Sequence, residues 1–287
     1  MKRFLKWLAL SAAIVIVGLG GFVAYGLYSI YFGKHVYETV APMLPAHLND
    51  TAILVFSKTN GYRHEDAIPA ANKAIEAIAR KHGWSAVFTE NGAVFNPTIL
   101  SRFKATVWNN TSGDTLNADQ KAAFQNYIEN GGGFVGIHAA GGDPHYDWDW
   151  YVQNIIGAQF LAHPLNPQFQ RATIHVADDA ADPIMANVPA FWSRVDEWYS
   201  FKNNPRANGV HVLATLDETT YSPKLFWKDL RMGSDHPVIW KHLVGKGRVF
   251  YSAMGHQAPA YTEPEYVSVL DRAIQWSAGL AGSDLGK

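Results

Sequence analysis

The sequence predicts an α/β fold with a mostly parallel sheet, helices on both faces and an added antiparallel edge, preceded by one membrane-spanning helix. Short apolar runs alternate with amphipathic stretches in the first half of the chain, closely spaced strand patterns follow in the second half, and a long uncharged run lies at the N-terminus. Parallel strands need crossover connections, so alternating strand and helix patterns indicate a parallel sheet.

Length and composition limit the classes of protein to consider. The chain has 287 residues, of which 48% are hydrophobic and 17% charged, which is typical of a globular protein with one substantial domain. A formal net charge of −1 gives no basic surface for a phosphate backbone, so we expect no nucleic-acid partner. The absence of cysteine excludes disulfides, a thiol nucleophile and thiolate metal sites. The oligomeric state stays open.

The N-terminus carries a predicted membrane anchor. Lys2, Arg3 and Lys6 precede an uncharged run over residues 7–33. This run is longer than the roughly 7–15 apolar residues of a signal peptide and exceeds the ~20 residues that span a bilayer. We expect an uncleaved signal-anchor over residues 1–33, with a cleaved signal peptide as the alternative. The basic residues favour a cytoplasmic N-terminus, which places the main domain in the periplasm or outside the cell.

Two further regions follow the anchor. Residues 34–50 contain Pro42 and Pro45, which interrupt regular structure, and are predicted to be a tether. Residues 51–287 are predicted to form a single domain.

The pattern of elements inside that domain changes half-way. The first half predicts strands at 52–56, 85–89, 105–109 and 134–137, separated by helices at 66–82, 97–103 and 117–129. The second half predicts strands at 170–176, 195–201, 210–214, 237–240 and 247–251, and a final helix at 263–278. Residues 243–246 are expected to join the last two strands as a hairpin, which gives the antiparallel edge.

Residues 131–143 predict a sharp turn at the end of a buried strand. The glycines at 131–133 end the preceding helix, residues 134–137 suit the strand, and His138 lies where the strand stops. In hydrolases and amidotransferases such a turn exposes a serine or cysteine nucleophile beside backbone N–H groups. Here the exposed position carries a histidine.

Polar residues cluster at the predicted carboxyl ends of the strands, where open parallel sheets bind ligands. His64, Asn109, Asn110, His138 and His256 each follow a strand or lie at its end. Glu197, His163 and Asp143 are further candidates. We therefore expect several of these side chains to converge.

Three interpretations of this cluster are open. His138 or His256 could act as a general base with a carboxylate as its orienting partner, which needs no cofactor. Alternatively, His64, His138 and His256 with Glu197 or Asp143 could hold a divalent metal, although no local His-x-x-x-His spacing supports this. In the third interpretation each histidine only satisfies backbone groups of its loop.

Four motifs in order resemble the ThuA-like (trehalose utilisation) domain family. They lie at residues 59–64, 131–139, 235–240 and 245–256, and the resemblance covers roughly residues 51–279. The family is similar in fold to class I glutamine amidotransferases, which implies a flavodoxin-like sheet. In those enzymes the turn carries cysteine, and a late strand ends in a histidine with a glutamate two positions on. Here His138 replaces the cysteine, His256 matches the histidine and Ala258 replaces the glutamate, so glutamine hydrolysis is not expected.

The resemblance implies a small-molecule carbohydrate ligand, either a disaccharide or a modified sugar. We expect an enzyme of carbohydrate utilisation, a hydrolase or a lyase without a cysteine nucleophile, with His138, His256, His64 and Glu197 as catalytic candidates and no required cofactor. Expected substrate-binding residues are Asn109, Asn110, Asp143, Tyr62, His163 and the possible stacking aromatics Tyr146, Trp148 and Trp198. A non-catalytic sugar-binding or scaffolding domain and a metal-dependent hydrolase are the alternatives, and the substrate and reaction stay open.

Overall fold

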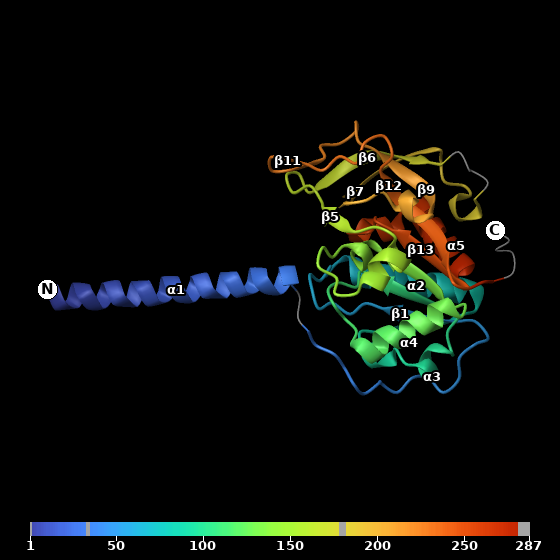
Figure 1. Ribbon diagram of the computed structural model, residues 1–287, viewed down its shortest axis with the longest axis horizontal. Coiled ribbons are helices and arrows are strands. Elements are labelled where there is room, and N and C mark those ends of the chain that lie inside the picture. Colours follow the sequence, from blue (N-terminus) through green and yellow to red (C-terminus); the bar gives the residue numbers. More distant parts are fainter. Residues whose placement is uncertain (1, 33–34, 178–181, 281–287) are drawn as a thin grey trace.

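The computed structural model describes residues 2–32, 35–177 and 182–280, and within these residues nine strands form one sheet (Figure 1). The strand order is β2-β1-β3-β4-β13-β12-β9-β6-β7. The predicted boundary between anchor and tether at residues 33–34 lies outside the described residues, as do residues 281–287 of the predicted domain.

Five neighbouring strands run parallel. They are β2 (Ser85–Thr89), β1 (Ala52–Phe56), β3 (Ala105–Asn109), β4 (Gly133–Ile137) and β13 (Gly247–Ser252). The first three have the predicted bounds. Strands β1 and β3 are buried along their whole length, because each is a continuous apolar run covered on both faces. The parallel part of the predicted fold is therefore confirmed.

The antiparallel part is a four-strand extension of this sheet. It consists of β12 (Pro237–Val244), β9 (His211–Asp217), β6 (Phe169–Val176) and β7 (Phe191–Glu197). The predicted strand at 195–201 is wrong in its bounds, because β7 ends at Glu197 and β8 (Ser200–Phe201) pairs instead with β5 (Phe160–Ala162). The hairpin formed by β10 (Lys224–Leu225) and β11 (Lys228–Asp229) was not predicted.

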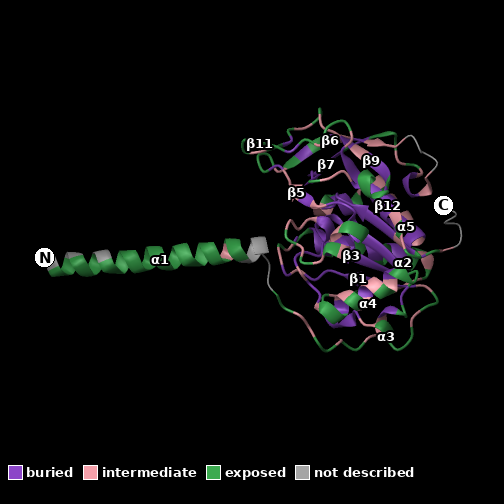
Figure 2. Ribbon diagram, in the orientation of Figure 1, coloured by how far each residue is buried: buried purple, intermediate pink, exposed green. Residues whose placement is uncertain are grey.

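Helices cover both faces of the parallel part, as predicted. Helices α2 (Ala67–His82) and α5 (Pro264–Ser277) share one core with Ile53 and Val55 of β1. Helices α3 (Pro97–Leu100) and α4 (Ala118–Glu129) share the other with Leu54 and Phe56. This alternation follows from the two-residue period of a strand, and Figure 2 shows the resulting buried sheet between half-exposed helices.

Short helical turns connect these elements. Residues Tyr151–Ile156 (η3) form a π-helix. The 3₁₀ turns are η1 (Gly92–Val94), η2 (His138–Gly141), η4 (Pro183–Met185), η5 (Pro205–Asn208) and η6 (Ala258–Thr262).

Helix α1 (Lys2–Phe32) extends away from the domain, and its described side chains are almost all exposed (Figure 2). The segment Lys6–Tyr28 is long and apolar enough to cross a membrane. The following residues lie against the domain: Asn49 Nδ2 donates to the Gly83 carbonyl, and Arg102 donates to the Pro45 carbonyl at 2.5 Å. The division into tether and domain stays a prediction.

Candidate active site

The turn after β4 has the left-handed backbone that a nucleophile elbow requires. His138 has a φ of +48°, which is uncommon outside glycine, and its side chain is fully buried. Its Nδ1 lies 2.8 Å from the Ala253 carbonyl oxygen. A carbonyl only accepts hydrogen bonds, so Nδ1 carries the proton and Nε2 of the neutral ring presents a lone pair. The elbow is therefore retained, with an imidazole nitrogen in place of a nucleophile.

His256 reaches the same place from the loop after β13. Gly255 has a φ of +112°, which favours glycine, and its N–H donates to Asp196 Oδ2 at 2.9 Å. The His256 N–H donates to Asp196 Oδ1 at 3.1 Å. The Asp196 carboxylate thus fixes the backbone that presents the His256 ring. Arg194 pairs with Asp196 at 3.0 Å, and both side chains are buried.

Glu197, the last residue of β7, lies between the two histidines. Its Oε2 lies 3.0 Å from His256 Nδ1 and 3.3 Å from His138 Nε2, and these two nitrogens are 3.0 Å apart. Its other oxygen, Oε1, accepts from Gln168 Nε2 and lies 3.1 Å from His163 Nδ1. The glutamate missing at position 258 is therefore replaced by one from a distant strand, with Oε2 directed at both rings.

His64 completes the cluster from the loop after β1. Its ring centroid is 4.4 Å from that of His256 and 5.0 Å from that of His138. The side chain is buried, and its Nδ1 has no hydrogen-bond partner within the described part of the chain. One ligand atom from each of His64, His138, Glu197 and His256 can be chosen so that all lie within 4.8 Å of one another.

Burial and charge shift the pKa values of three members of the cluster, His64, His138 and Glu197. Burial, with smaller contributions from His138 and His256, lowers the pKa of His64 to about 2. Burial also lowers the pKa of His138, although the Glu197 carboxylate, 3.3 Å from its Nε2, opposes this effect. For Glu197, burial would raise the pKa, but its contacts with His138 and His256 outweigh burial and hold the pKa well below its ordinary value. Near neutral pH, His64 and His138 are neutral and Glu197 is ionised.

This arrangement brings together more lone pairs than protons. His138 Nε2 and Glu197 Oε2 both accept, so the contact between them is favourable only with a shared donor or a cation. A proton on His256 Nδ1 can serve both acceptors, which leaves Nε2 of His256 free as a base. A divalent cation can serve all three atoms, because neutral imidazoles and a carboxylate are suitable ligands. The site can therefore support proton transfer or metal chemistry.

The buried neutral His64 predicts a pH dependence of stability. Its pKa is about 2 in the folded state and ~6.5 when unfolded, so the unfolded chain binds more protons between these values. The stability that neutral His64 contributes is present above pH ~6.5 and declines as the pH falls toward 2. Between about pH 6 and pH 4, we expect the unfolding free energy of the wild type to fall more steeply than that of His64→Asn, by ~1.4 kcal/mol per pH unit. Urea unfolding in chelating buffer measures this, and equal slopes for both proteins would contradict it.

A cavity of about 620 Å³ opens beside the cluster. Predicted site residues on its lining are Tyr62, His64, Asp143, His163, Glu197 and His256, while His138 lies behind them. Burial raises the pKa of the Asp143 carboxyl. The structure thus brings the four catalytic candidates and three of the binding candidates to one place.

The other five predicted binding residues all lie in the described part of the chain, and none of them lines this cavity. Asn109 Nδ2 donates to the Ile68 carbonyl and to Asn72 Oδ1, and Asn110 Nδ2 donates to the Tyr261 hydroxyl. Trp198 is fully buried and donates to the Gln170 carbonyl. The two remaining aromatic candidates, Tyr146 and Trp148, pack against the core that contains α4. None of these five side chains is therefore placed to contact a sugar bound in the cavity.

Sequence reasoning missed four residues of the site. Gln168 and Tyr199 line the cavity, and the Tyr199 ring stacks on His138 with centroids 4.1 Å apart. Asp196 and Arg194 support the loop of His256 from behind. Two adjacent acidic residues, at 196–197, lie inside the predicted strand at 195–201, and this unusual pattern could have indicated that Asp196 belongs to the site.

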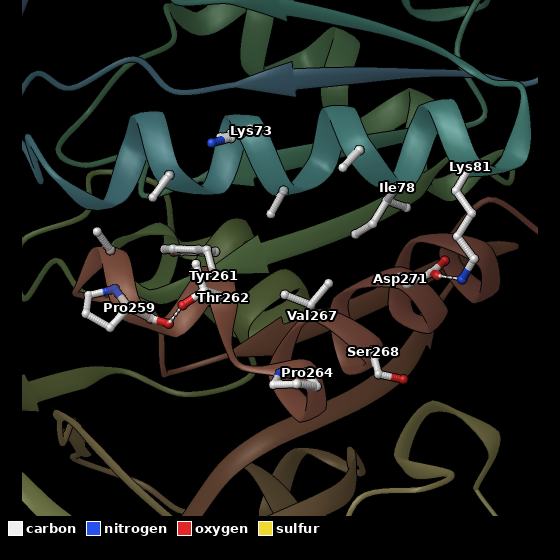
Figure 3. A pocket seen from close by; sticks show the side chains of 14 residues that line it. Lys73, Ile78, Lys81, Pro259, Tyr261, Thr262, Pro264, Val267, Ser268 and Asp271 are labelled. Carbon is white, nitrogen blue, oxygen red and sulfur yellow. Dashed lines mark hydrogen bonds and ion pairs between the residues drawn. The ribbon is translucent and has the colours of Figure 1, made fainter.

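A second, larger cavity of about 760 Å³ lies between α2 and the segment containing η6 and α5 (Figure 3). Its lining is mainly aliphatic, and Lys81 pairs with Asp271 at 2.7 Å on its edge. Its lining residues, which all lie in the described chain, include no histidine. The histidine-lined cavity is therefore the candidate active site.

Comparisons with solved structures support the fold. A ThuA-like protein from Bacteroides uniformis is 24% identical with a TM-score of 0.67, covering 82% of this chain and 95% of that chain. A ThuA-like protein from Parabacteroides merdae is 17% identical with a TM-score of 0.63, covering 80% and 91%. A β-galactosidase from Rahnella sp. R3 is 12% identical with a TM-score of 0.50, covering 83% of this chain but 32% of that chain. At these identities the likeness shows the fold alone.

Sequence comparison shows the family. Among curated proteins none matches this chain. The ThuA family, described as "Trehalose utilisation", matches residues 52–277, which is most of the chain and nearly all of the predicted domain. The resemblance in the four motifs is thereby confirmed, and the chain belongs to the ThuA family.

Proposed function

We propose that this chain is a membrane-anchored, sugar-processing hydrolase that uses a divalent metal ion held by His138, Glu197 and His256, with His64 as a fourth ligand. The observation that carries this proposal is the meeting of three ligand atoms from three separate elements at 3.0–3.3 Å. The first expectation from the sequence, metal-free acid/base chemistry, becomes the second candidate.

The ligand distances fit a metal ion. Zinc binds imidazole nitrogen at ~2.0–2.1 Å and carboxylate oxygen at ~2.0–2.2 Å, so the ligands of a tetrahedral site lie about 3.3 Å apart. The three observed separations are 3.0, 3.0 and 3.3 Å. His64, whose Nδ1 has no hydrogen-bond partner among the described residues, supplies a further ligand atom nearby. If this ring shifted slightly inward, the ion would have four protein ligands. If it did not, one position would stay open for water.

Hydrogen bonds behind the ligands support the same interpretation. The Ala253 carbonyl fixes the His138 tautomer, Gln168 donates to the far oxygen of Glu197, and Asp196 holds the backbone of His256. Such outer partners set the orientation and basicity of metal ligands. A metal ion bound here would lower the pKa of a water molecule and polarise a sugar oxygen.

Three considerations support a sugar substrate. The family is described by trehalose utilisation, and the fold occurs within a β-galactosidase. The cavity volume of about 620 Å³ lies within the 300–1,000 Å³ usual for small-molecule sites. Asp143, His163 and Gln168 on its lining provide hydrogen-bonding groups for hydroxyls.

One contact favours the second candidate, in which the site works without metal. His256 Nδ1 lies 3.0 Å from Glu197 Oε2, which is the carboxylate partner that a general base needs. With Nδ1 donating to Glu197, Nε2 of His256 is the proton acceptor. Binding of sugar without turnover would instead indicate the non-catalytic alternative.

The anchor completes the proposal. Helix α1 spans the membrane with its N-terminus in the cytoplasm, because the basic residues Lys2, Arg3 and Lys6 precede the apolar segment. The domain then lies in the periplasm or outside the cell.

Metal analysis of the full-length protein tests the proposal. We expect close to one divalent ion per chain, and we expect disaccharides or oxidised sugars to raise the melting temperature before chelation but much less after it. His175→Asn, which changes a histidine on β6 outside the cavity, should retain the metal. Substoichiometric metal together with sugar turnover that resists chelator would favour proton transfer by His256.

A further inference from the structure

The tip of the β10–β11 hairpin carries two exposed aromatic side chains. Phe226 and Trp227 form its two-residue turn and are 70% and 94% exposed. Phe226 has a φ of +53°, in the region where turns of this length usually have asparagine or glycine. Folding alone would therefore favour other residues here. Exposed apolar groups at such a position mark an interaction surface.

This hairpin forms part of the rim of the histidine-lined cavity. Leu225 and Lys228, the residues on either side of the tip, line that cavity. Lys224 and Lys228 are exposed and bracket the aromatic pair. Whatever binds the tip therefore lies at the entrance of the candidate active site.

The segment after α1 is attached to the end of the sheet where the histidine-lined cavity lies. The Val36 carbonyl accepts from Lys58 Nζ at 2.6 Å and from Asn60 Nδ2 at 3.1 Å. Both donors belong to the loop after β1, whose Gly61 lines the cavity. The Tyr37 hydroxyl donates to Asp114 at 2.9 Å, in the loop after β3. The chain therefore enters the domain beside the cavity.

Chain length limits how far this edge can lie from the membrane. Helix α1 ends at Phe32, so four residue steps separate its end from Val36. At 3.3–3.6 Å per residue these steps span at most about 14 Å, and the four helical residues from Tyr28, where the apolar segment ends, to Phe32 add about 6 Å. Figure 1 shows α1 leaving the domain on the side where β5 and β11 lie. The cavity edge, with its aromatic hairpin, is consequently held close to any bilayer that α1 crosses.

We propose that the β10–β11 hairpin is a second membrane contact, which places Phe226 and Trp227 in the headgroup region and holds the cavity entrance at the bilayer surface. This inference rests on the proposed anchoring of α1. Aromatic rings favour the membrane interface, and the lysines at 224 and 228 attract anionic headgroups. The short connection to α1 makes a weak contact effective, because it keeps the local concentration of lipid high.

The lack of cysteine allows a direct test with single-cysteine variants of the full-length chain. Trp227→Cys probes the hairpin and Val17→Cys probes the anchor. Leu243→Cys is the matched control, because Leu243 is 62% exposed and pairs with Arg248 near the start of β13, at the amino ends of the parallel strands and away from the cavity. Each variant is labelled with an environment-sensitive fluorophore and reconstituted in vesicles of phosphatidylcholine and phosphatidylglycerol that contain spin-labelled quencher lipids.

We expect blue-shifted, lipid-quenched emission at positions 17 and 227, with quenching at 227 several-fold stronger than at 243. Quenching at 17, with 227 no more quenched than 243, would overturn the hairpin contact and leave the anchor intact. Absence of quenching at 17 would overturn the anchor, and with it this inference.

Discussion

Replacing Glu197 with glutamine is expected to weaken metal binding and sugar turnover by more than about 100-fold. Glutamine keeps the size of the side chain but removes the negative charge that faces His138 and His256 at 3.3 and 3.0 Å. Changing an outer partner of a metal ligand already costs about 10–100-fold in affinity or activity, so losing the carboxylate ligand itself should cost more. Calorimetric titration with Zn²⁺ or Mn²⁺ measures the metal affinity, and turnover is measured on any sugar identified by thermal stabilisation.

Glu218→Gln is the matched control for this substitution. Glu218 also contacts a buried histidine, His236, at 2.7 Å, and it does not line the histidine-lined cavity. Its replacement should affect stability while metal affinity is retained. Equal metal affinity in wild type and Glu197→Gln would remove Glu197 from the site.

Replacing Asp196 with alanine is expected to produce the largest loss of stability. Arg194 and Asp196 are each 1% exposed in their side chains and lie 3.0 Å apart, so the substitution leaves a buried guanidinium without its main partner. Breaking a buried ion pair from one side typically costs 3–5 kcal/mol. For a chain of this size the melting temperature should fall by roughly 10 °C.

This substitution should also alter the site, which a purely structural role would not require. The Gly255 and His256 N–H groups lose their acceptor, so the His256 ring is less well positioned and metal affinity should decrease even well below the melting temperature. Asp217→Ala is the control, because Asp217 is a partly exposed aspartate 3.6 Å from His175, where we expect less than ~1 kcal/mol. If Asp196→Ala lost no more stability and metal affinity than Asp217→Ala, the role assigned to Asp196 would be contradicted.

The parallel half of the fold was predictable because its strands are short, continuous apolar runs. The bounds at 52–56 and 105–109 agree with β1 and β3 because both faces of these strands are buried. In β7 the pattern is different: buried Arg194 and Asp196 occupy inward positions that usually carry apolar residues. A strand whose inward side contains an ion pair does not show the expected alternation, and the prediction placed it too late in the chain.

The candidate site was partly predictable because strand ends converge in a parallel sheet. His138, His256 and His64 follow β4, β13 and β1, so their meeting follows from topology. Glu197 was recognised as a candidate, but its position between the rings depends on the antiparallel extension and on contacts far apart in sequence. The aromatic candidates were placed less well, because a tryptophan that stacks on a ligand and one that fills a core have the same sequence signal.

The most direct test of the metal site is to locate the ion in crystals of the full-length protein by anomalous scattering. The proposal predicts a peak of a divalent metal about 2.0–2.2 Å from His138 Nε2, His256 Nδ1 and Glu197 Oε2. The peak should be absent from Glu197→Gln and present in Glu218→Gln. A wild-type crystal grown with Zn²⁺ that shows no peak among these three side chains would contradict the metal centre.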